Sequence, residues 1–316
     1  MPERLGPALP EPLFDRLTLV GIGLIGSSIA RAARQLKLAR TLVAVDRDDA
    51  VVARVRELDF ADEVTTELAA GVSGADLVVL CVPVGACGAV AEAMRPALKP
   101  GAIVSDVGSV KGSVVAQVEP HLPDGVHLVP AHPVAGTEQS GPDAGFATLF
   151  LNRWCILTPP EGTDSAAVER VRALWEALGS DVEVMSAQHH DLVLAITSHV
   201  PHLIAYNIVG TAADMEEVTQ SEVIKFSAGG FRDFTRIAAS DPVMWRDVFL
   251  NNKEAVLEML GRLNEDIALL ARAIRWGEGD KLFDLFTRTR AIRRGIISSG
   301  QETPEPDFGR RREDKA

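Results

Sequence analysis

The first half of the chain alternates between short apolar runs and segments whose apolar residues recur at helical spacing. Continuous apolar runs are typical of parallel strands that helices cover on both faces. The alternation therefore predicts a doubly wound α/β domain over residues 15–185. The runs expected to form its strands are Leu17–Val20, Thr41–Val45, Asp76–Val82, Ala102–Val104 and His127–Pro130.

Two shorter apolar runs follow near the end of this half. Trp154–Leu157 and Asp181–Val184 lie on either side of a segment with helical periodicity, from about Ser165 to Leu178. We expect both runs to extend the same sheet.

The pattern changes after Met185, because only helix-period segments follow. Asp191–Ala212 predicts one long buried helix with a kink at Pro201, since proline donates no backbone hydrogen bond. Pro242–Trp276 and the amphipathic Asp280–Gly295 predict further helices. So much apolar helical surface is often found in dimerisation domains.

These patterns divide the chain into four parts. The leader is rich in proline and the tail is polar, so we expect both to be disordered. The predicted parts are a disordered leader at 1–14, a nucleotide-binding α/β domain at 15–185, an all-α dimerisation and substrate domain at 186–297 and a disordered tail at 298–316.

A glycine-rich turn joins the first predicted strand to the first predicted helix. Gly21, Gly23 and Gly26 fit the G-x-G-x-x-G pattern, and Asp46 ends the next strand. This arrangement binds dinucleotides, with the pyrophosphate at the helix N-terminus and the acid on the ribose hydroxyls. Asp46 favours NAD over NADP because it repels an added phosphate, although Arg47 could offset that repulsion. The predicted cofactor residues are Gly21, Gly23, Leu24, Ile25, Gly26, Asp46, Arg47, Val82 and Pro83.

The segment 130–145 combines a histidine with a glycine-rich polar loop. His132 is followed by Pro133, which disfavours a helix at the histidine, and Gly136, Gly141 and Gly145 follow. His132 is expected just past the carboxyl end of a strand, where open α/β sheets bind their ligands. The residues alone leave two interpretations open: a catalytic histidine, or a structural one held by a backbone carbonyl.

Several histidines gather near Pro201 in the helical half. His199 and His202 are one turn apart, whereas His190 lies on a different part of the helix. Because this spacing does not converge on one point, we predict no metal site; core or substrate contacts are the better interpretation.

Two arginines also stand out in the helical half. Arg232 and Arg236 lie at positions i and i+4, so one face of a helical turn would present both. An arginine fork suits a carboxylate ligand. The alternative is a salt bridge to Asp233 or Asp241, which we expect for one of the two arginines.

Composition narrows the classes of partner. The chain has 316 residues, of which 47% are hydrophobic and 24% charged, with a formal net charge of −12. An acidic protein of this kind disfavours nucleic acid and anionic membranes as partners. Three cysteines without metal-ligand spacing indicate a reducing compartment, and the longest apolar run is too short to span a bilayer. We expect a cytoplasmic protein.

Five motifs together resemble the prephenate/arogenate (cyclohexadienyl) dehydrogenase family of tyrosine biosynthesis, over about residues 17–295. They are GIGLIGSSIA, DVGSVKG, HPVAGTEQSG, HD followed by SHVPH, and GGFRDFTRIAASDPVMW. The resemblance implies a Rossmann domain followed by a helical domain that forms a homodimer. It also implies NAD as cofactor and a small anionic substrate, which loses a hydride and carbon dioxide as its ring becomes aromatic.

The resemblance also assigns roles to residues. His132 would take the proton of the ring hydroxyl, Ser109 would support it, and Arg236 would bind the ring carboxylate. The other residues that it implies for the substrate pocket are Ser198, His202, Glu138, Gly229 and Trp245.

Three questions stay open at the level of sequence. Prephenate and arogenate differ only in their side chain, and we favour prephenate by analogy with NAD-preferring bacterial enzymes. A β-hydroxyacid-type dehydrogenase would use a lysine base, for which only Lys225 and Lys253 are near. A non-catalytic NAD sensor would be expected to lack the catalytic set that is present here.

Overall fold

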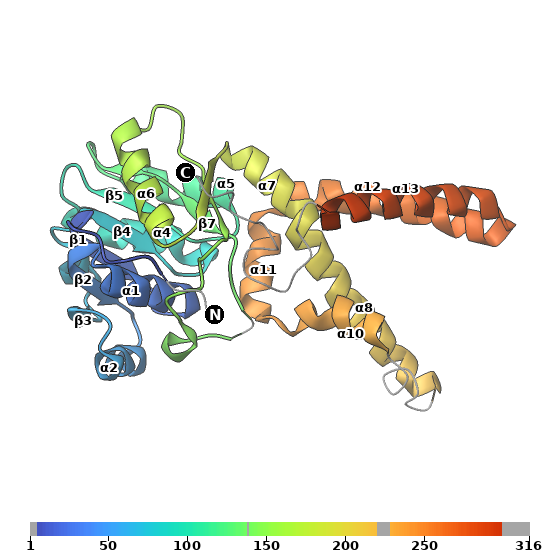
Figure 1. Cartoon of the computed structure of the whole chain (residues 1–316), viewed down its shortest axis with the longest axis horizontal. Helices are drawn as coiled ribbons and strands as arrows, with labels where there is room; N and C mark the ends of the chain where they lie inside the picture. The colour runs from blue at the N-terminus through green and yellow to red at the C-terminus, as the bar shows by residue number, and fades with distance from the viewer. Residues whose placement is uncertain (1–4, 138, 220–227, 299–316) are drawn as a thin grey trace.

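The computed structural model describes residues 5–137, 139–219 and 228–298 (Figure 1). An α/β domain forms the left of the molecule in Figure 1, and a set of long helices extends from it to the right. The α/β domain ends at β9 (Asp181–Val184), and the helical half begins at α7 (Ala187–Leu194).

The main sheet has six parallel strands in the order β3-β2-β1-β4-β5-β6. This is the strand order of dinucleotide-binding Rossmann domains, which bind their ligand where the order reverses, beside β1 and β4. The strands are β1 (Phe14–Val20), β2 (Ala39–Val45), β3 (Glu63–Thr65), β4 (Leu77–Leu80), β5 (Ile103–Asp106) and β6 (His127–Leu128). The helices between them are α1 (Leu24–Leu36), α2 (Asp49–Leu58), α3 (Leu68–Val72), α4 (Cys87–Met94) and α5 (Lys111–Val118), with short 3₁₀ turns at Val84–Ala86, Arg95–Ala97 and Glu119–His121.

The apolar strands bury both of their faces, as the sequence predicts. In β4, Leu77 and Val79 pack into the core beneath α1, whereas Val78 and Leu80 pack into the core on the other side with α4 and α5. All four side chains are at most 1% exposed. Covering both faces removes the need for polar alternation, which explains the continuous apolar runs.

The prediction that Trp154–Leu157 and Asp181–Val184 extend the main sheet is wrong. They form β8 and β9 of a separate three-stranded sheet with β7 (Ala131–Pro133), and β7 runs antiparallel to β8. The chain leaves the main sheet at Pro130, between β6 and β7. Pro130 has no N–H to donate to the main sheet, and its carbonyl accepts from Thr158 N, directly after β8. Helix α6 (Ser165–Ala177) connects β8 to β9.

The leader differs from the expected disorder over residues 5–13. Leu5 is buried in the core, Leu9 N donates to Leu36 O at 3.0 Å, and Leu13 N donates to Leu38 O at 2.9 Å. The leader therefore packs against the end of α1, since its leucines bury apolar surface there. Residues 1–4 and the predicted disordered tail from 299 lie outside the described residues.

The helical half contains the long helix expected from Asp191 onward, but with two differences. The helix runs as α7, a π-helical segment at Ala195–His199 and α8 (Val200–Thr219). The π segment precedes Pro201, whose missing N–H cannot bond the preceding turn. The helix is also far less buried than expected: Ile208, Val209 and Met215 are exposed.

The remaining helices include one break that the sequence pattern did not show. The segment predicted as Pro242–Trp276 divides at Asn252, whose φ of −111° and ψ of 35° are not helical. The elements are α10 (Gly229–Thr235), a 3₁₀ turn at Arg236–Ala239, α11 (Pro242–Asn251), α12 (Lys253–Trp276) and α13 (Gly279–Ser298).

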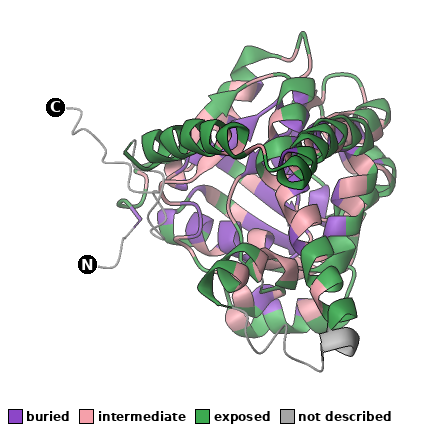
Figure 2. Cartoon of the chain, turned by 90° about the vertical axis from the view of Figure 1, so that its right-hand side faces the viewer, coloured by how far each residue is buried: buried purple, intermediate pink, exposed green. Residues whose placement is uncertain are grey.

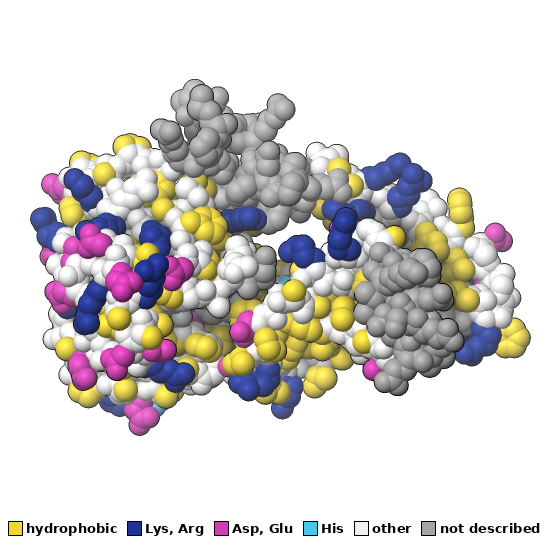
Figure 3. All heavy atoms as spheres, turned by 90° about the horizontal axis from the view of Figure 1, so that it is seen from below, with side chains coloured by type: hydrophobic (Ala, Val, Ile, Leu, Met, Phe, Trp, Pro, Cys, Tyr) yellow, Lys and Arg dark blue, Asp and Glu magenta, His cyan; other side chains and the backbone are white. Residues whose placement is uncertain are grey.

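Helix α11 joins the two halves. Its Trp245 and Val248 share a buried core cluster with Val84, at the end of β4. Helices α8, α12 and α13 project away from the α/β domain, and Figure 2, which looks onto the helical half, shows most of their surface exposed. Hydrophobic side chains gather on the same half in Figure 3.

One helical stretch, Ala187–Met215, is long and apolar enough to cross a membrane by length and composition. Only 28% of its most apolar window is buried within this chain. A helix that a second protein chain covers has the same properties, so the stretch by itself does not establish a membrane span.

Candidate active site

The glycine turn has the geometry of a phosphate cradle. A Cβ at Gly21, whose φ is +94°, would lie 2.7 Å from Cys81 O, and a Cβ at Gly26 would lie 2.2 Å from Gly21 O. Gly23 instead borders open space, and no side chain caps the helix N-terminus there. Leu24 and Ile25 open α1 directly behind it. An anion can therefore reach the first N–H groups of α1.

Asp46 directly follows β2, beside this turn. Its Oδ2 accepts a hydrogen bond from Ile22 N at 2.8 Å, and its Oδ1 accepts from Asp48 N at 3.1 Å. Arg47 is exposed, and Val82 and Pro83 follow the end of β4. The turn, the acid and the end of β4 thus line the crevice where the strand order reverses, and they fit a dinucleotide.

His132 lies within β7, not in a loop beyond a strand as expected, and is 6% exposed. Its strand is held at the end of β5, because Asp106 Oδ1 accepts from Ala131 N at 3.2 Å. The buried Lys111 pairs with Asp106 and donates to Ala131 O at 2.7 Å. These contacts fix the backbone of His132 at the carboxyl edge of the main sheet.

A second histidine, not a backbone carbonyl, is the partner of His132. Nδ1 of His132 lies 2.8 Å from Nε2 of His190, and Nδ1 of His190 lies 2.8 Å from Oδ1 of Asp191. The Asp191 carboxylate also accepts from Lys111 N and Gly112 N, both at 2.8 Å, at the N-terminus of α5. His190 and Asp191 of α7 thus form a hydrogen-bonded chain from the N-terminus of α5 to the ring of His132.

Burial keeps these rings neutral. It lowers the pKa of His132 well below 6.5, and the nearby His190, Lys111 and His199 lower it further. Burial likewise lowers the pKa of His190, although its bond to Asp191 opposes the shift. The site therefore holds an uncharged histidine, which can accept a proton at neutral pH.

His199 occupies the π segment beside Ser109. Asn252 Nδ2 donates to Asp191 O at 2.9 Å and lies 3.1 Å from Nδ1 of His199. Nδ1 must therefore accept, so Nε2 carries the proton of the neutral ring. Burial lowers the pKa of His199 to about 4, and the backbone of Ser109 lies near the ring.

Four predicted substrate residues lie close together on the helical side. The His202 ring stacks on Trp245 with centroids 3.6 Å apart, and its Nδ1 bonds Ser198 O at 2.8 Å. Arg236 lies close enough to His202 to lower its pKa, after the larger effect of burial. Tyr206 Oη donates to Ser240 O at 2.6 Å, which ties the Arg236 turn to α8.

The two arginines separate as the sequence analysis anticipates. Arg232 pairs with Asp233 at 3.1 Å, whereas Arg236 is exposed and forms no ion pair within the described part of the chain. Gly229 begins α10, and a Cβ at this position would lie 3.8 Å from the Arg232 guanidinium. Glu138 lies outside the described residues.

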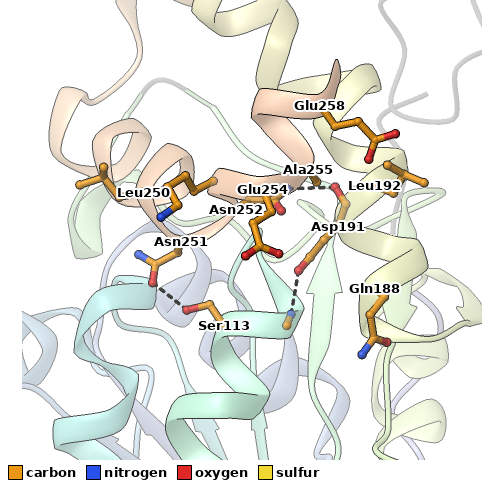
Figure 4. A pocket seen from close by; sticks show the side chains of 12 residues that line it. Ser113, Gln188, Asp191, Leu192, Leu250, Asn251, Asn252, Glu254, Ala255 and Glu258 are labelled. Carbon is orange, nitrogen blue, oxygen red and sulfur yellow. Dashed lines mark hydrogen bonds between the residues drawn. The ribbon is translucent and has the colours of Figure 1, made fainter. Parts of the chain in front are cut away.

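A separate pocket of about 560 Å³ lies between α5, α7 and the start of α12 (Figure 4). Asp191 points into it, as do Ser113 and Glu254. None of the predicted substrate residues lines this pocket, so we do not assign it to the substrate. Within residues 5–137, 139–219 and 228–298, no three His, Cys, Asp or Glu side chains are arranged so that they could hold a metal ion.

Comparison with known families agrees with this geometry. Residues 29–184 match the nucleotide-binding domain of prephenate dehydrogenase, and residues 186–288 match its dimerization domain. The chain belongs to the prephenate dehydrogenase family. It is accordingly an oxidoreductase with a nucleotide-binding Rossmann domain and a helical second domain.

Three relatives illustrate the range of this family. A cyclohexadienyl dehydrogenase from Zymomonas mobilis is 44% identical over 89% of this chain and 96% of its own length. The structure of Aquifex aeolicus prephenate dehydrogenase with hydroxyphenyl propionate and NAD⁺ superposes with a TM-score of 0.84, at 33% identity, over 91% of this chain and 99% of the other. Synechocystis arogenate dehydrogenase superposes with a TM-score of 0.77, at 26% identity, over 89% of this chain and 99% of the other.

Sequence reasoning missed several residues that build this site. Asp106 and Lys111 flank Ser109 within the DVGSVKG motif, and His190 and Asp191 form the HD motif. The motifs were recognised, but nothing in one sequence shows that Asp106 of β5 holds the backbone beside His132 while a histidine of α7 contacts its ring. Asn252 had no sequence signal at all.

Proposed function

We propose that this protein catalyses the NAD-dependent oxidative decarboxylation of prephenate to 4-hydroxyphenylpyruvate, in tyrosine biosynthesis. One observation carries the proposal: a buried neutral histidine lies at the carboxyl edge of a nucleotide-binding sheet, and the helical half presents Arg236, which has no ion-pair partner among the described residues. A dicarboxylate substrate with a ring hydroxyl matches those two groups. The activities of the Zymomonas mobilis and Aquifex aeolicus relatives support this reaction class.

In the proposed mechanism each group acts on a different part of the substrate. Bound NAD supplies the hydride acceptor. His132 accepts the hydrogen bond of the ring hydroxyl, Ser109 supports it, and Arg236 binds the ring carboxylate. Ser198, His202 and Trp245 would line the substrate site, and Glu138 and Gly229 complete the proposed set of substrate residues. Gly21, Gly23, Leu24, Ile25 and Gly26 would hold the pyrophosphate side of NAD, with Asp46 and Arg47 at its ribose and Val82 and Pro83 beside it.

The electrons of the reaction balance without an outside acid or base. The bond between the ring and its carboxylate breaks, its electron pair enters the ring, and carbon dioxide leaves. The ring carbon that bears the hydroxyl gives up its hydride as the ring becomes aromatic. His132 draws the hydroxyl proton toward its own nitrogen during this step, and the proton ends on the oxygen of the phenol product.

We further propose that two copies of the chain form the working enzyme. The helical half matches a dimerization domain, and its α8, α12 and α13 expose large apolar side chains. A second copy is a better occupant of this surface than a bilayer, because the same Ala187–Met215 stretch carries His190, Asp191 and His199. Anionic membranes and nucleic acid stay unfavourable partners for an acidic chain, and we expect it in the cytoplasm.

The test is NADH or NADPH formation by the purified protein, with prephenate and arogenate offered separately, each with NAD and with NADP. We expect the fastest turnover with prephenate and NAD. Turnover with arogenate would indicate the alternative, a dual-specificity cyclohexadienyl or an arogenate enzyme, as the names of two relatives suggest. No turnover in any mixture, with NAD binding established by a thermal shift, would contradict the proposed activity.

A further inference from the structure

The contacts of His190 fix the direction of each hydrogen bond around His132. The Asp191 carboxylate already accepts two backbone N–H groups of α5, and an ionised carboxylate can only accept. His190 Nδ1, 2.8 Å away, must therefore carry the proton of that bond. In a neutral imidazole the other nitrogen is then an acceptor, so His190 Nε2 carries a lone pair.

This lone pair determines which nitrogen of His132 is free. Nδ1 of His132 lies 2.8 Å from Nε2 of His190, so it must be the donor. Nε2 of His132 is then unprotonated, and none of the described residues hydrogen-bonds it. We propose that His190, oriented by Asp191, is a positioning residue that holds His132 in the tautomer whose Nε2 accepts the substrate hydroxyl. The inference rests on the proposed function, in which His132 is the base.

The surroundings favour this neutral arrangement. A charged His190 would donate from both nitrogens, so His132 would have to accept at Nδ1 and would carry its proton on Nε2. Burial lowers the pKa of both rings and so disfavours that state. The charged groups around the pair are Asp106 and Lys111, which neutralise one another, and Asp191; the third histidine nearby, His199, is neutral.

Asp191 has a second consequence for the reaction. His132 takes on positive charge as it draws the hydroxyl proton. The hydrogen bond to His190 spreads part of that charge onto the second ring, and the neighbouring Asp191 carboxylate stabilises it, as the carboxylate does in other base–orienter pairs. The proton returns to the product oxygen, so the pair does not have to pass it to solvent. The expected role is therefore orientation and charge stabilisation, not net proton transfer.

The first experiment compares two neighbouring histidines on α7. His190→Asn removes the ring that contacts His132, whereas His189→Asn alters an exposed residue whose ring makes no hydrogen bond within the described chain. We expect His190→Asn to lower kcat by about tenfold to a hundredfold, with little change in the KM for NAD or for prephenate. His189→Asn should keep the wild-type kcat. Equal kcat values for the two variants, both folded by circular dichroism, would overturn the inference.

A double-mutant comparison separates positioning from a general loss of structure. If His190 acts only through His132, the double variant His132→Asn/His190→Asn should be no slower than His132→Asn alone. Multiplied losses would show that His190 acts independently of His132, and would overturn the inference. If His132→Asn itself keeps full activity, the proposed role of His132 as the base is wrong. The proposed function fails only if the wild-type protein turns over none of the substrate and cofactor mixtures, so the two failures are distinguishable.

A spectroscopic measurement tests the tautomer without any assay of activity. The ¹⁵N resonances of the histidine rings distinguish protonated from unprotonated nitrogens, and the chain has only 7 histidines to assign. We expect neutral His132 to be protonated at Nδ1 in the wild type, and to become a mixture of tautomers in His190→Asn. A proton on Nε2 of His132 in the wild type at neutral pH would overturn the inference, even if His190→Asn is slow or poorly folded.

Discussion

At the scale of the residue, the site depends on burial more than on residue type. A histidine in water has a pKa of about 6.5, so half of it is charged near that pH. His132 is 6% exposed and its pKa lies well below that value. The side chain of His132 therefore stays neutral, and able to accept a hydrogen bond, over a wider range of pH than an exposed histidine would.

The first prediction at this scale concerns the pH dependence of turnover. Protonation of His132 removes the acceptor, so activity must fall as the pH decreases through its pKa. Because burial lowers that pKa, kcat should stay nearly constant from pH 7.5 through about 6.5 and fall only at lower pH. A pH profile of kcat and of kcat/KM for prephenate is the measurement, and a midpoint at 6.5 or above would contradict the burial argument.

A second prediction compares the two arginines of the α10 region. Arg236→Ala should raise the KM for prephenate by about tenfold or more, the scale of a charged hydrogen bond, with a smaller change in kcat. Arg232→Ala is the matched control, because Arg232 already pairs with Asp233. Steady-state kinetics of both variants decide the matter: an effect of Arg236→Ala on kcat alone would argue against a carboxylate clamp.

At the scale of the element, short irregular segments position the site. The π segment at Ala195–His199 carries Ser198 and His199, and β7 is a three-residue strand outside the main sheet. The end of β2 brings Asp46 to the glycine turn by a hydrogen bond to Ile22 N. Regular helices and strands supply the rigid frame, and these segments give the side chains their direction.

The prediction at this scale concerns cofactor choice at the end of β2. Asp46→Asn removes the charge but keeps a side-chain oxygen for Ile22 N, so the turn should retain its shape. Without the repulsion, the KM for NADP should fall by about tenfold or more. Kinetics with both cofactors measure the change, and Asp46→Ala, which also loses the hydrogen bond, separates charge from turn structure. If the preference for NAD over NADP is unchanged in both variants, Asp46 does not set that preference, and Arg47 is the next residue to test.

At the scale of the whole molecule, the two halves of the chain differ in how much of their apolar surface they bury within one chain. The α/β domain buries both faces of its sheet within one chain. The helical half instead exposes Leu269, Trp276 and Phe283 by at least 65% each. Exposed apolar surface of that extent on one region marks an interaction site, which agrees with the proposed dimer.

The corresponding prediction concerns assembly. Ile267 and Ile274 are seven residues apart on α12, so they share one face, and both are more than half exposed. Replacing both with aspartate should convert a dimer to monomers in sedimentation velocity, while Glu265→Gln, on the same helix, should not. A wild-type protein that sediments as a monomer at micromolar concentration would contradict the dimer outright.

The sequence by itself determined the architecture and much of the candidate site. Apolar runs and helical periods are local consequences of burial, so the strands of the Rossmann domain and the helical second half could be predicted from them. The glycine turn, Asp46, His132 and Arg236 could be proposed as site residues because each stands in a motif whose local chemistry is recognisable. The same local patterns led to the wrong sheet for β8 and β9, because an apolar run does not indicate which sheet it joins.

Only the tertiary structure decided which groups surround His132. Asp106, Lys111, His190 and Asp191 come from β5, α5 and α7, and their contacts depend on how those elements pack. Packing also orders residues 5–13, which the sequence predicted to be disordered, against the end of α1. The same packing buries His132 and so lowers its pKa. Desolvation and hydrogen-bond direction are properties of a three-dimensional environment, so no single stretch of sequence could carry them.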